Sequence, residues 1–243
     1  MDNQLTKDLC IRLMKAETEE EVINLLKQHG YWDNSDYWRF YGDQENNYSS
    51  AGNQADEAES ALIEKITNAR DAILMNECLE NCIDPEGPDA PRSVKDAVAK
   101  FFEENPNHEL AGQIKEWDNI KRREIAKKIS VYITGAKPGT KTYPCINIAD
   151  LGEGQTPERI PNTILSLGKS IKLRIPFVHG KFNMGGTAAL VYCGKNNLQF
   201  NNWLIRIVNN TLNHEQLSLN LCTTGYPIRK NTNILSGNLL LAF

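Results

Sequence analysis

The sequence predicts an α+β fold, because its hydrophobic periodicity changes along the chain. Up to about residue 128, apolar residues recur mainly at helical spacing, whereas residues 130–155 hold short β-rich runs separated by turn residues. The last part, about residues 195–243, is rich in Asn, Leu and Thr and contains two further strand candidates. With 243 residues, 40% of them hydrophobic, the chain suits one large α/β unit plus an extension.

The composition also excludes several classes of protein. A net charge of -4 with both signs well mixed argues against a dedicated nucleic-acid binder. No apolar run is long enough to span a membrane, and the polar start MDNQLTKDLC lacks the apolar core of a secretory signal. None of the six cysteines forms a CxxC pair, and Cys78 and Cys82 lack a second pair of zinc ligands. We therefore expect a cytoplasmic protein with reduced, mostly buried cysteines.

The N-terminal third is predicted to be two long helices with an aromatic segment between them. Residues 5–28 carry apolar side chains at helical spacing, enclose a run of glutamates, and end at His29-Gly30. Residues 30–55 are rich in Tyr, Trp, Asn and Gly and predict an ordered, lid-like loop, since so many exposed aromatics would be costly. A long helix follows at about residues 55–80.

The middle and the end of the chain alternate between helix and strand signals. Ser93 is predicted to cap a helix that carries Val94 to Phe102, and a charged helix is expected at about residues 112–128. SVYITGAKPGT and YPCINIADLGEGQ predict two adjacent strands of a hairpin. TPERIPNTILSL restarts a helix, and a glycine-rich loop then runs into another, apolar helix. NNLQFNNWLIRIVNN and NILSGNLLLAF are the two C-terminal strand candidates.

The stretch IEKITNARDAIL places three polar residues in one narrow stripe of its helix. Glu64, Asn68 and Asp71 stand at positions i, i+4 and i+7, with an apolar stripe on roughly the opposite side. Taken alone, this pattern favours a solvated helix face over a site with a carboxylate and a metal ligand.

Two later stretches favour a site. In IADLGEGQ, Asp150 ends a strand and can accept a hydrogen bond from an exocyclic amine, while the glycines after it let a flat ring approach the backbone. In HGKFNMGGTAAL, glycines precede an apolar helix, an arrangement that can aim backbone amides at an anion. Lys169, Lys172 and Lys181 lie in or beside this second stretch. Neither a Walker loop nor a GxGxxG fingerprint is present.

These three motifs, in this order over residues 55–195, resemble the GHKL superfamily of ATPases, which includes the gyrases, the ninety-kilodalton heat-shock chaperones, the histidine kinases and the MutL proteins. The resemblance implies a two-layer α/β sandwich of the Bergerat type, with a mixed, mainly antiparallel sheet and helices on one face. Residues 1–54 would be an extension, and about 76–128 a helical insertion in the nucleotide-binding domain. Residues 196–243 would complete the sheet or begin a truncated continuation.

The resemblance also implies a role for each motif residue. Glu64 would activate the water that attacks the γ-phosphate, Asn68 would coordinate Mg²⁺, and Asp71 matches the aspartate that follows. Asp150 would read the adenine amino group, Gly152 and Gly154 would lie beside the adenine, and residues 155–180 would be the ATP lid. The expected nucleotide contacts further include Lys169, Lys172, Gly180, Lys181, Phe182, Asn183, Met184, Gly185, Gly186 and Thr187.

The function implied is ATP binding with slow, Mg²⁺-dependent hydrolysis, in which ATP or ADP in the site orders the lid and drives homodimerisation or partner binding. Phosphoryl transfer needs positioning and charge neutralisation, which these residue types supply. Asn183 departs from the chaperone pattern, and no second domain follows to send a lysine to the γ-phosphate. The chain would then be a truncated form or a module that depends on a partner.

Two alternatives remain open from the sequence. The first is a degenerate GHKL fold that serves as a protein-interaction module without catalysis, with the aromatic segment 31–48 as its surface. The second is a kinase that phosphorylates a partner protein. The histidine-kinase branch is the poorer fit, because His29 and His108 suit surface positions and His179 suits the lid hinge rather than a phospho-acceptor.

Overall fold

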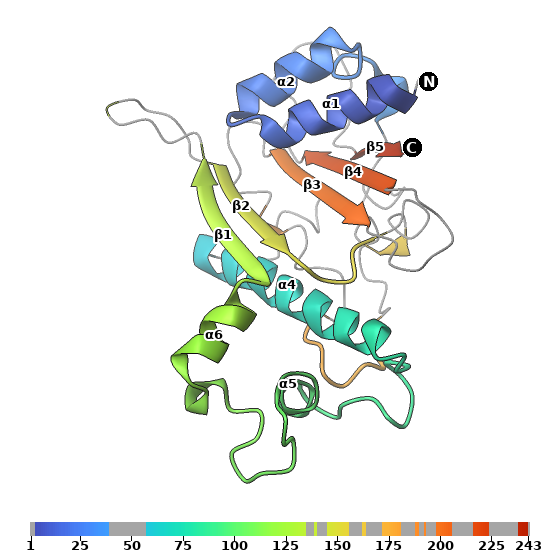
Figure 1. The fold of residues 1–243 in the computed structure, drawn as a ribbon. Helices are drawn as coiled ribbons and strands as arrows, with labels where there is room; N and C mark the ends of the chain where they lie inside the picture. Colours follow the sequence, from blue (N-terminus) through green and yellow to red (C-terminus); the bar gives the residue numbers. More distant parts are fainter. Residues whose placement is uncertain are drawn as a thin grey trace.

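The protein combines helices with antiparallel strands and is therefore of the α+β class, as predicted (Figure 1). The computed structural model describes residues 3–38, 57–134, 145–155 and 172–180, the strands at 198–205, 216–223 and 238–242, and Gly139, Asn162, Thr163, Ala188, Ala189 and Tyr192. The predicted helix from TPERIPNTILSL and most of the glycine-rich loop with its apolar helix lie outside these residues. In the described residues, no helix is long and apolar enough to cross a membrane.

The strands form two separate hydrogen-bonded sheets. β1 (Ile129–Thr134) and β2 (Cys145–Asp150) are the predicted hairpin, with Ile129 opposite Asp150. β3 (Leu198–Ile205), β4 (Gln216–Thr223) and β5 (Asn238–Ala242) form a three-stranded antiparallel sheet in that order. β3 and β5 confirm the two strand candidates. β4 was not predicted, although the alternation of Leu with Ser and Asn in QLSLNLCT is a two-residue pattern.

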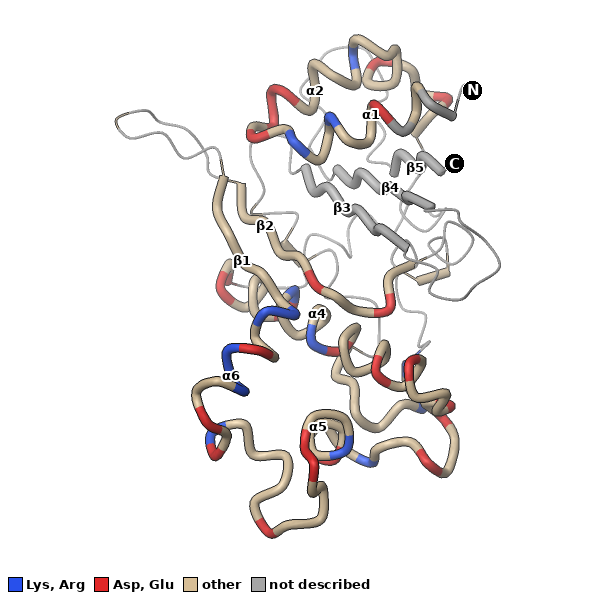
Figure 2. The backbone as a smooth tube through the Cα atoms, in the orientation of Figure 1, with Lys and Arg blue, Asp and Glu red and all other residues tan. Residues whose placement is uncertain are grey.

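The predicted helix 5–28 is wrong, because the chain breaks into α1 (Asn3–Lys15) and α2 (Glu19–Gln28). The Thr18 side chain accepts a hydrogen bond from the Glu21 amide at 3.2 Å and so caps a new helix. The glutamates in the first turn of α2 then stand at the positive end of the helix dipole, where acidic residues are stabilising (Figure 2). The stop at His29-Gly30 is confirmed, with Gly30 at φ +73°.

The aromatic segment packs, as far as it is described, onto the α1–α2 helical hairpin. Tyr31 is buried in a cluster with residues of both helices, and Trp32 and Trp38 pack against that cluster. The Trp38 indole donates a hydrogen bond to the Tyr31 carbonyl at 2.8 Å. Residues 31–38 therefore cover an apolar surface of this hairpin, which accounts for their aromatic content. Residues 39–48 of the same segment lie outside the described part.

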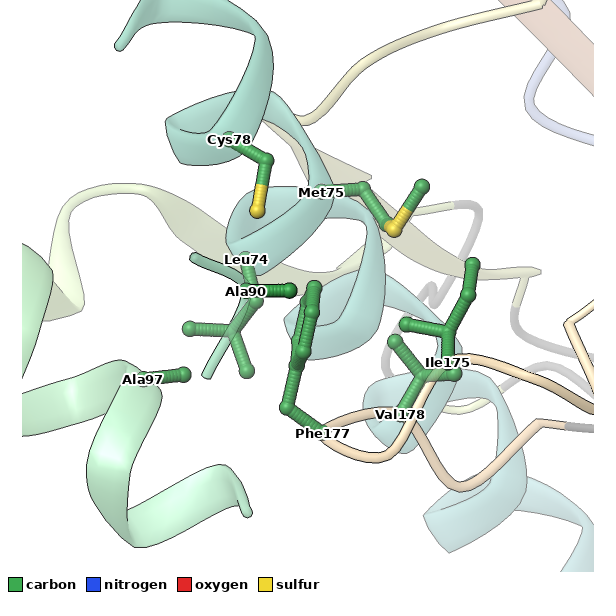
Figure 3. Close-up of a cluster of buried hydrophobic side chains, with 8 residues drawn as sticks. All are labelled: Leu74, Met75, Cys78, Ala90, Ala97, Ile175, Phe177 and Val178. Atoms are coloured by element: carbon green, nitrogen blue, oxygen red, sulfur yellow. The ribbon is translucent and has the colours of Figure 1, made fainter. Parts of the chain in front are cut away.

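The central element is α4 (Ala58–Glu80), which confirms the long predicted helix. It packs against β2 on one side and against α5 (Val94–Phe102) elsewhere on its surface (Figure 1). Its C-terminal half contributes Leu74, Met75 and Cys78 to the main core, which the loop 172–180 completes. The core cluster consists of Leu74, Met75, Cys78, Ala90, Ala97, Ile175, Phe177 and Val178 (Figure 3). Because α4 is covered from several directions, it is buried over much more than one stripe.

The predicted insertion is helical but is divided differently from the prediction. Ser93 caps α5, accepting the Asp96 amide at 3.1 Å, as expected. The single helix expected at 112–128 is wrong, because the chain forms a short 3₁₀ turn, η3 (Ile114–Glu116), and then α6 (Asn119–Ala126). Asp118 causes the restart, since its carboxylate accepts the amides of Ile120 and Lys121.

The four described cysteines are free thiols in two different environments. Cys10 and Cys78 are buried, and burial raises the pKa of the Cys10 thiol to about 12. Cys82 and Cys145 are exposed, so the expectation of mostly buried cysteines holds for only half of these four. Cys82 lies just beyond α4 rather than on its face, and it adopts φ +55°.

Candidate functional site

The polar stripe of α4 does not face open solvent. Asp71 is only 1% exposed, and Glu64 and Asn68 are partly buried. A buried carboxylate must be paired or hydrogen-bonded, because ionised groups lose the stabilisation of water. The solvated-face interpretation of the stripe is therefore wrong at Asp71.

The partners of Asp71 come from a segment more than one hundred residues further along the chain. Its Oδ2 accepts the backbone amides of His179 at 2.7 Å and of Gly180 at 2.9 Å. Its Oδ1 pairs with the guanidinium of Arg70, whose Nη2 lies 2.6 Å away. Both carboxylate oxygens are thus engaged by the protein itself. Arg70 Nη2 also lies 3.0 Å from His179 Nδ1, so one guanidinium contacts both the carboxylate and the ring.

Gly180 lies against the second residue of the stripe. An ideal Cβ built at Gly180 would be 2.5 Å from Asn68 Oδ1 and 3.7 Å from Asp71 Oδ2. A real Cβ essentially never approaches another heavy atom to 2.5 Å, so a side chain at this position would displace the carboxamide at the end of the Asn68 side chain. The start of the third motif is thereby held next to the first motif.

The second motif reaches the same helix through Gly152. An ideal Cβ at Gly152 would be 2.5 Å from the Cβ of Ala72, and the Glu153 amide donates to the Ala72 carbonyl at 3.1 Å. This bond is possible because the turn after β2 lies directly on α4. Gly154 follows at φ +65°, a conformation that glycine adopts without strain. Ala72, the residue after Asp71 on α4, is thus the contact point of this turn.

Asp150 ends β2 beside this turn. Its Oδ1 accepts the Gly152 amide at 2.9 Å, and Oδ2 has no hydrogen-bond partner among the described residues. Asp150 is exposed as a whole residue, but partial desolvation of its carboxyl raises the pKa above its ordinary value, and the Gly152 amide and Lys172 act in the opposite direction. A strand-end carboxylate with a perturbed pKa is typical of a functional site.

Lys172, an expected nucleotide contact, forms an ion pair with Glu153. The Lys172 Nζ lies 3.5 Å from Glu153 Oε1, and the Glu153 side chain is 4% exposed. Beside this pair lies a pocket of about 340 Å³, which Met75 and Ile175 also line. Met75 stands four residues after Asp71, so the pocket continues the polar stripe towards the C-terminus of α4.

The structure brings together one part of the expected site. Glu64, Asn68, Asp71, Asp150, Gly152, Gly154, Lys172 and Gly180 are described, and three chain segments meet on α4. Most of the expected lid, 155–180, lies outside the described residues. The remaining expected contacts also lie outside them: Lys169, Lys181, Phe182, Asn183, Met184, Gly185, Gly186 and Thr187.

Sequence reasoning missed two participants in this arrangement, Arg70 and Glu153. Arg70 precedes a motif aspartate and Glu153 lies inside the Asp-x-Gly-x-Gly motif, but neither position carries a sequence signal for its partner. Within the described part of the chain, no group of three or more His, Cys, Asp or Glu residues is placed to hold a metal ion by itself. Comparison with protein-family models, curated proteins and solved structures finds no match to this chain.

Proposed function

We propose that this chain is a nucleotide-binding module, and more specifically a GHKL-type ATPase domain that binds ATP with Mg²⁺ and hydrolyses it slowly. The observation that carries the proposal is the meeting of three motifs on one helix. Gly152 contacts Ala72, and Gly180 contacts Asn68 and Asp71, although the sequence separates these residues by 80 positions or more. Motifs that only resembled a site by chance would have no reason to converge.

The chemistry of the residues suits the two ends of a nucleotide. Asp150 offers an acceptor at a strand end, beside glycines that leave the backbone open to a flat ring. The pocket of about 340 Å³ beside Glu153 and Lys172 is within the range of small-molecule sites, and Asp84, Glu86 and Glu153 give it an acidic lining. On α4, Asn68 lies about one helical turn and Glu64 about two turns before Ala72, the contact of Gly152. This separation suits the phosphate end of the nucleotide.

Asn68 fits a Mg²⁺ site in its donor chemistry. Mg²⁺ prefers oxygen ligands and keeps several waters, so one carboxamide oxygen together with phosphate oxygens is a sufficient set. When bound, the ion would neutralise charge on the phosphates. Glu64 would orient the attacking water and accept its proton, and Asp150 would hold the amino group of the base. Asn68, through its contact with Gly180, would keep its carboxamide in one orientation.

Calorimetry with a non-hydrolysable ATP analogue, with and without Mg²⁺, tests the proposal directly. We expect saturable binding that strengthens with Mg²⁺, with the corresponding GTP analogue as the control for recognition of the base. Phosphate release from ATP then tests turnover. Absence of binding under all conditions would favour the non-catalytic interaction module, and transfer of labelled phosphate to protein would favour the kinase.

A further inference from the structure

We propose that Asp71 is a positioning residue that sets the orientation of Asn68 through Gly180. Asp71 is 1% exposed, and the protein engages both of its carboxylate oxygens. It therefore holds the backbone of His179 and Gly180 rather than a ligand. This inference rests on the proposed function, in which Asn68 is a Mg²⁺ ligand. The hydrogen bonds of Asp71 would affect Mg²⁺ binding by setting the orientation of that ligand.

The hold on residues 179 and 180 comes from two side chains. The Asp71 carboxylate accepts both amides, and hydrogen bonds to an ionised acceptor are roughly twice as strong as neutral ones. Arg70 balances the buried charge at 2.6 Å and reaches the His179 ring with the same Nη2 atom. The segment is thus fixed by its backbone through Asp71 and by a side chain through Arg70.

The position of Gly180 in turn limits the orientation of the Asn68 side chain. The approach is so close that a Cβ at Gly180 would lie 2.5 Å from Asn68 Oδ1. The backbone of Gly180, which is hydrogen-bonded to Asp71, therefore restricts the Asn68 carboxamide sterically on one side. Groups that orient a metal ligand in this way typically change metal affinity by about 10- to 100-fold when they are removed.

The design uses two substitutions that disturb the same contact from opposite sides. Asp71→Asn keeps the shape of the side chain but removes its charge. Gly180→Ala forces Asn68 aside, while its Cβ would meet Asp71 Oδ2 only at an ordinary van der Waals distance of 3.7 Å. Glu80→Gln is the matched control, since Glu80 is an exposed residue of α4 that bonds only its neighbour Asn76 among the described contacts. Thermal unfolding of each variant checks that it is folded.

The first measurement uses the protein without nucleotide and without metal. We expect amide hydrogen exchange at residues 179 and 180 to accelerate by about tenfold or more in Asp71→Asn, beyond any change in global stability. The side-chain NH₂ resonances of Asn68 should shift in both Asp71→Asn and Gly180→Ala. Unchanged exchange and unchanged Asn68 resonances in Asp71→Asn would overturn the positioning role, whether or not the protein binds ATP.

The second measurement is the Mg²⁺ dependence of binding of the ATP analogue. We expect the Mg²⁺ concentration for half-saturation to rise by about tenfold in either variant, and the double variant to add little, because the two substitutions act on one contact. Affinity for the analogue in EDTA should stay within about twofold of wild type. Equal weakening with and without Mg²⁺ would contradict the inference, and failure of the wild type to bind would instead defeat the proposed function.

Discussion

The carboxylate of Asp71 accepts the backbone amide of Gly180 at 2.9 Å, across 109 residues of sequence. This bond joins the first and third motifs, and the contact of Gly152 with Ala72 joins the second motif to the same helix. α4 is therefore the element on which the candidate site is assembled. The positions of the described motif residues relative to α4 lead to specific expectations.

Replacing Glu64 with Gln should abolish hydrolysis and spare binding. The amide keeps the size of the side chain but cannot accept a proton from water, and loss of a general base typically lowers kcat by about 10²- to 10⁴-fold. Calorimetry should give an unchanged affinity for the ATP analogue. Glu59→Gln, at an exposed position in the first turn of the same helix, is the control. Parallel loss of binding in Glu64→Gln would contradict the assignment.

Asp150→Asn should weaken ATP binding, because the single side-chain oxygen of asparagine would still be needed to accept the Gly152 amide. If Oδ1 continues to accept that amide, the NH₂ group takes the place of Oδ2 and meets the amino group of adenine as donor against donor. Inosine triphosphate, which carries an oxygen acceptor at that position, should lose less affinity than ATP. Equal losses for the two nucleotides, measured by calorimetry, would show that Asp150 does not read the base.

The same substitution should not destabilise the protein at neutral pH. Desolvation raises the pKa of Asp150 in the folded state, so the ionised carboxylate is less favourable there than in the unfolded chain. This cost appears as the pH rises through the folded-state pKa and is absent below the ordinary value of 3.8. Urea unfolding of Asp150→Asn at pH 7 should give a free energy equal to or above that of wild type. A clear decrease would mean that the charge itself stabilises the fold.

Cys82→Gly should stabilise the end of α4. The helix closes with the Ile83 amide bonded to the Cys78 carbonyl at 2.8 Å, which requires Cys82 at φ +55°. Because a side chain is strained in this region, glycine should raise the free energy of unfolding by about 0.5–1 kcal/mol. Cys82→Ala removes the thiol but keeps the Cβ, so chemical denaturation should show no comparable gain. A similar gain for both variants would trace the effect to the thiol.

Glu103→Gln should destabilise the segment that holds α5 and α6 in a pH-dependent way. Its Oε1 accepts the Trp117 indole at 2.6 Å and the Gly112 amide at 3.0 Å, and Oε2 lies 3.2 Å from His108 Nε2. Burial acts to raise the pKa of Glu103, but these bonds outweigh it and hold the pKa below the ordinary value of 4.5. The contribution to stability is therefore present above 4.5 and is lost as the pH falls through the lowered pKa.

At pH 7 this substitution should lower the free energy of unfolding by about 1 kcal/mol, and the deficit should shrink in acid. Urea titrations between pH 3 and pH 7 provide the measurement. Glu104→Gln, at the neighbouring exposed carboxylate, should show no such deficit. A pH-independent loss in Glu103→Gln would indicate a packing effect rather than an effect of charge.

Local structure could be predicted from the sequence wherever its cause lies in neighbouring residues. The cap at Ser93, the stop at Gly30 and the β1–β2 hairpin follow from neighbouring residues, and each is present where it was predicted. Local causes were also behind the wrong predictions. Thr18 and Asp118 each begin a new helix inside a stretch that the apolar pattern alone presented as continuous.

The surroundings of the polar stripe of α4 depend on contacts between distant parts of the chain. Its spacing was visible in the sequence, but whether Asp71 faces water depends on segments 108 and 109 residues away, which bury it and use its charge. The same holds for the ion pair of Glu153 with Lys172, which no periodic pattern in the sequence indicates. Burial and ion pairing depend on which surfaces of the protein come into contact. The residues of one surface do not show which distant segment will pack against it. The sequence therefore identified the residues of the candidate site, and tertiary contact distinguished Asp71, whose carboxylate the protein itself engages, from the partly buried Glu64 and the exposed Asp150.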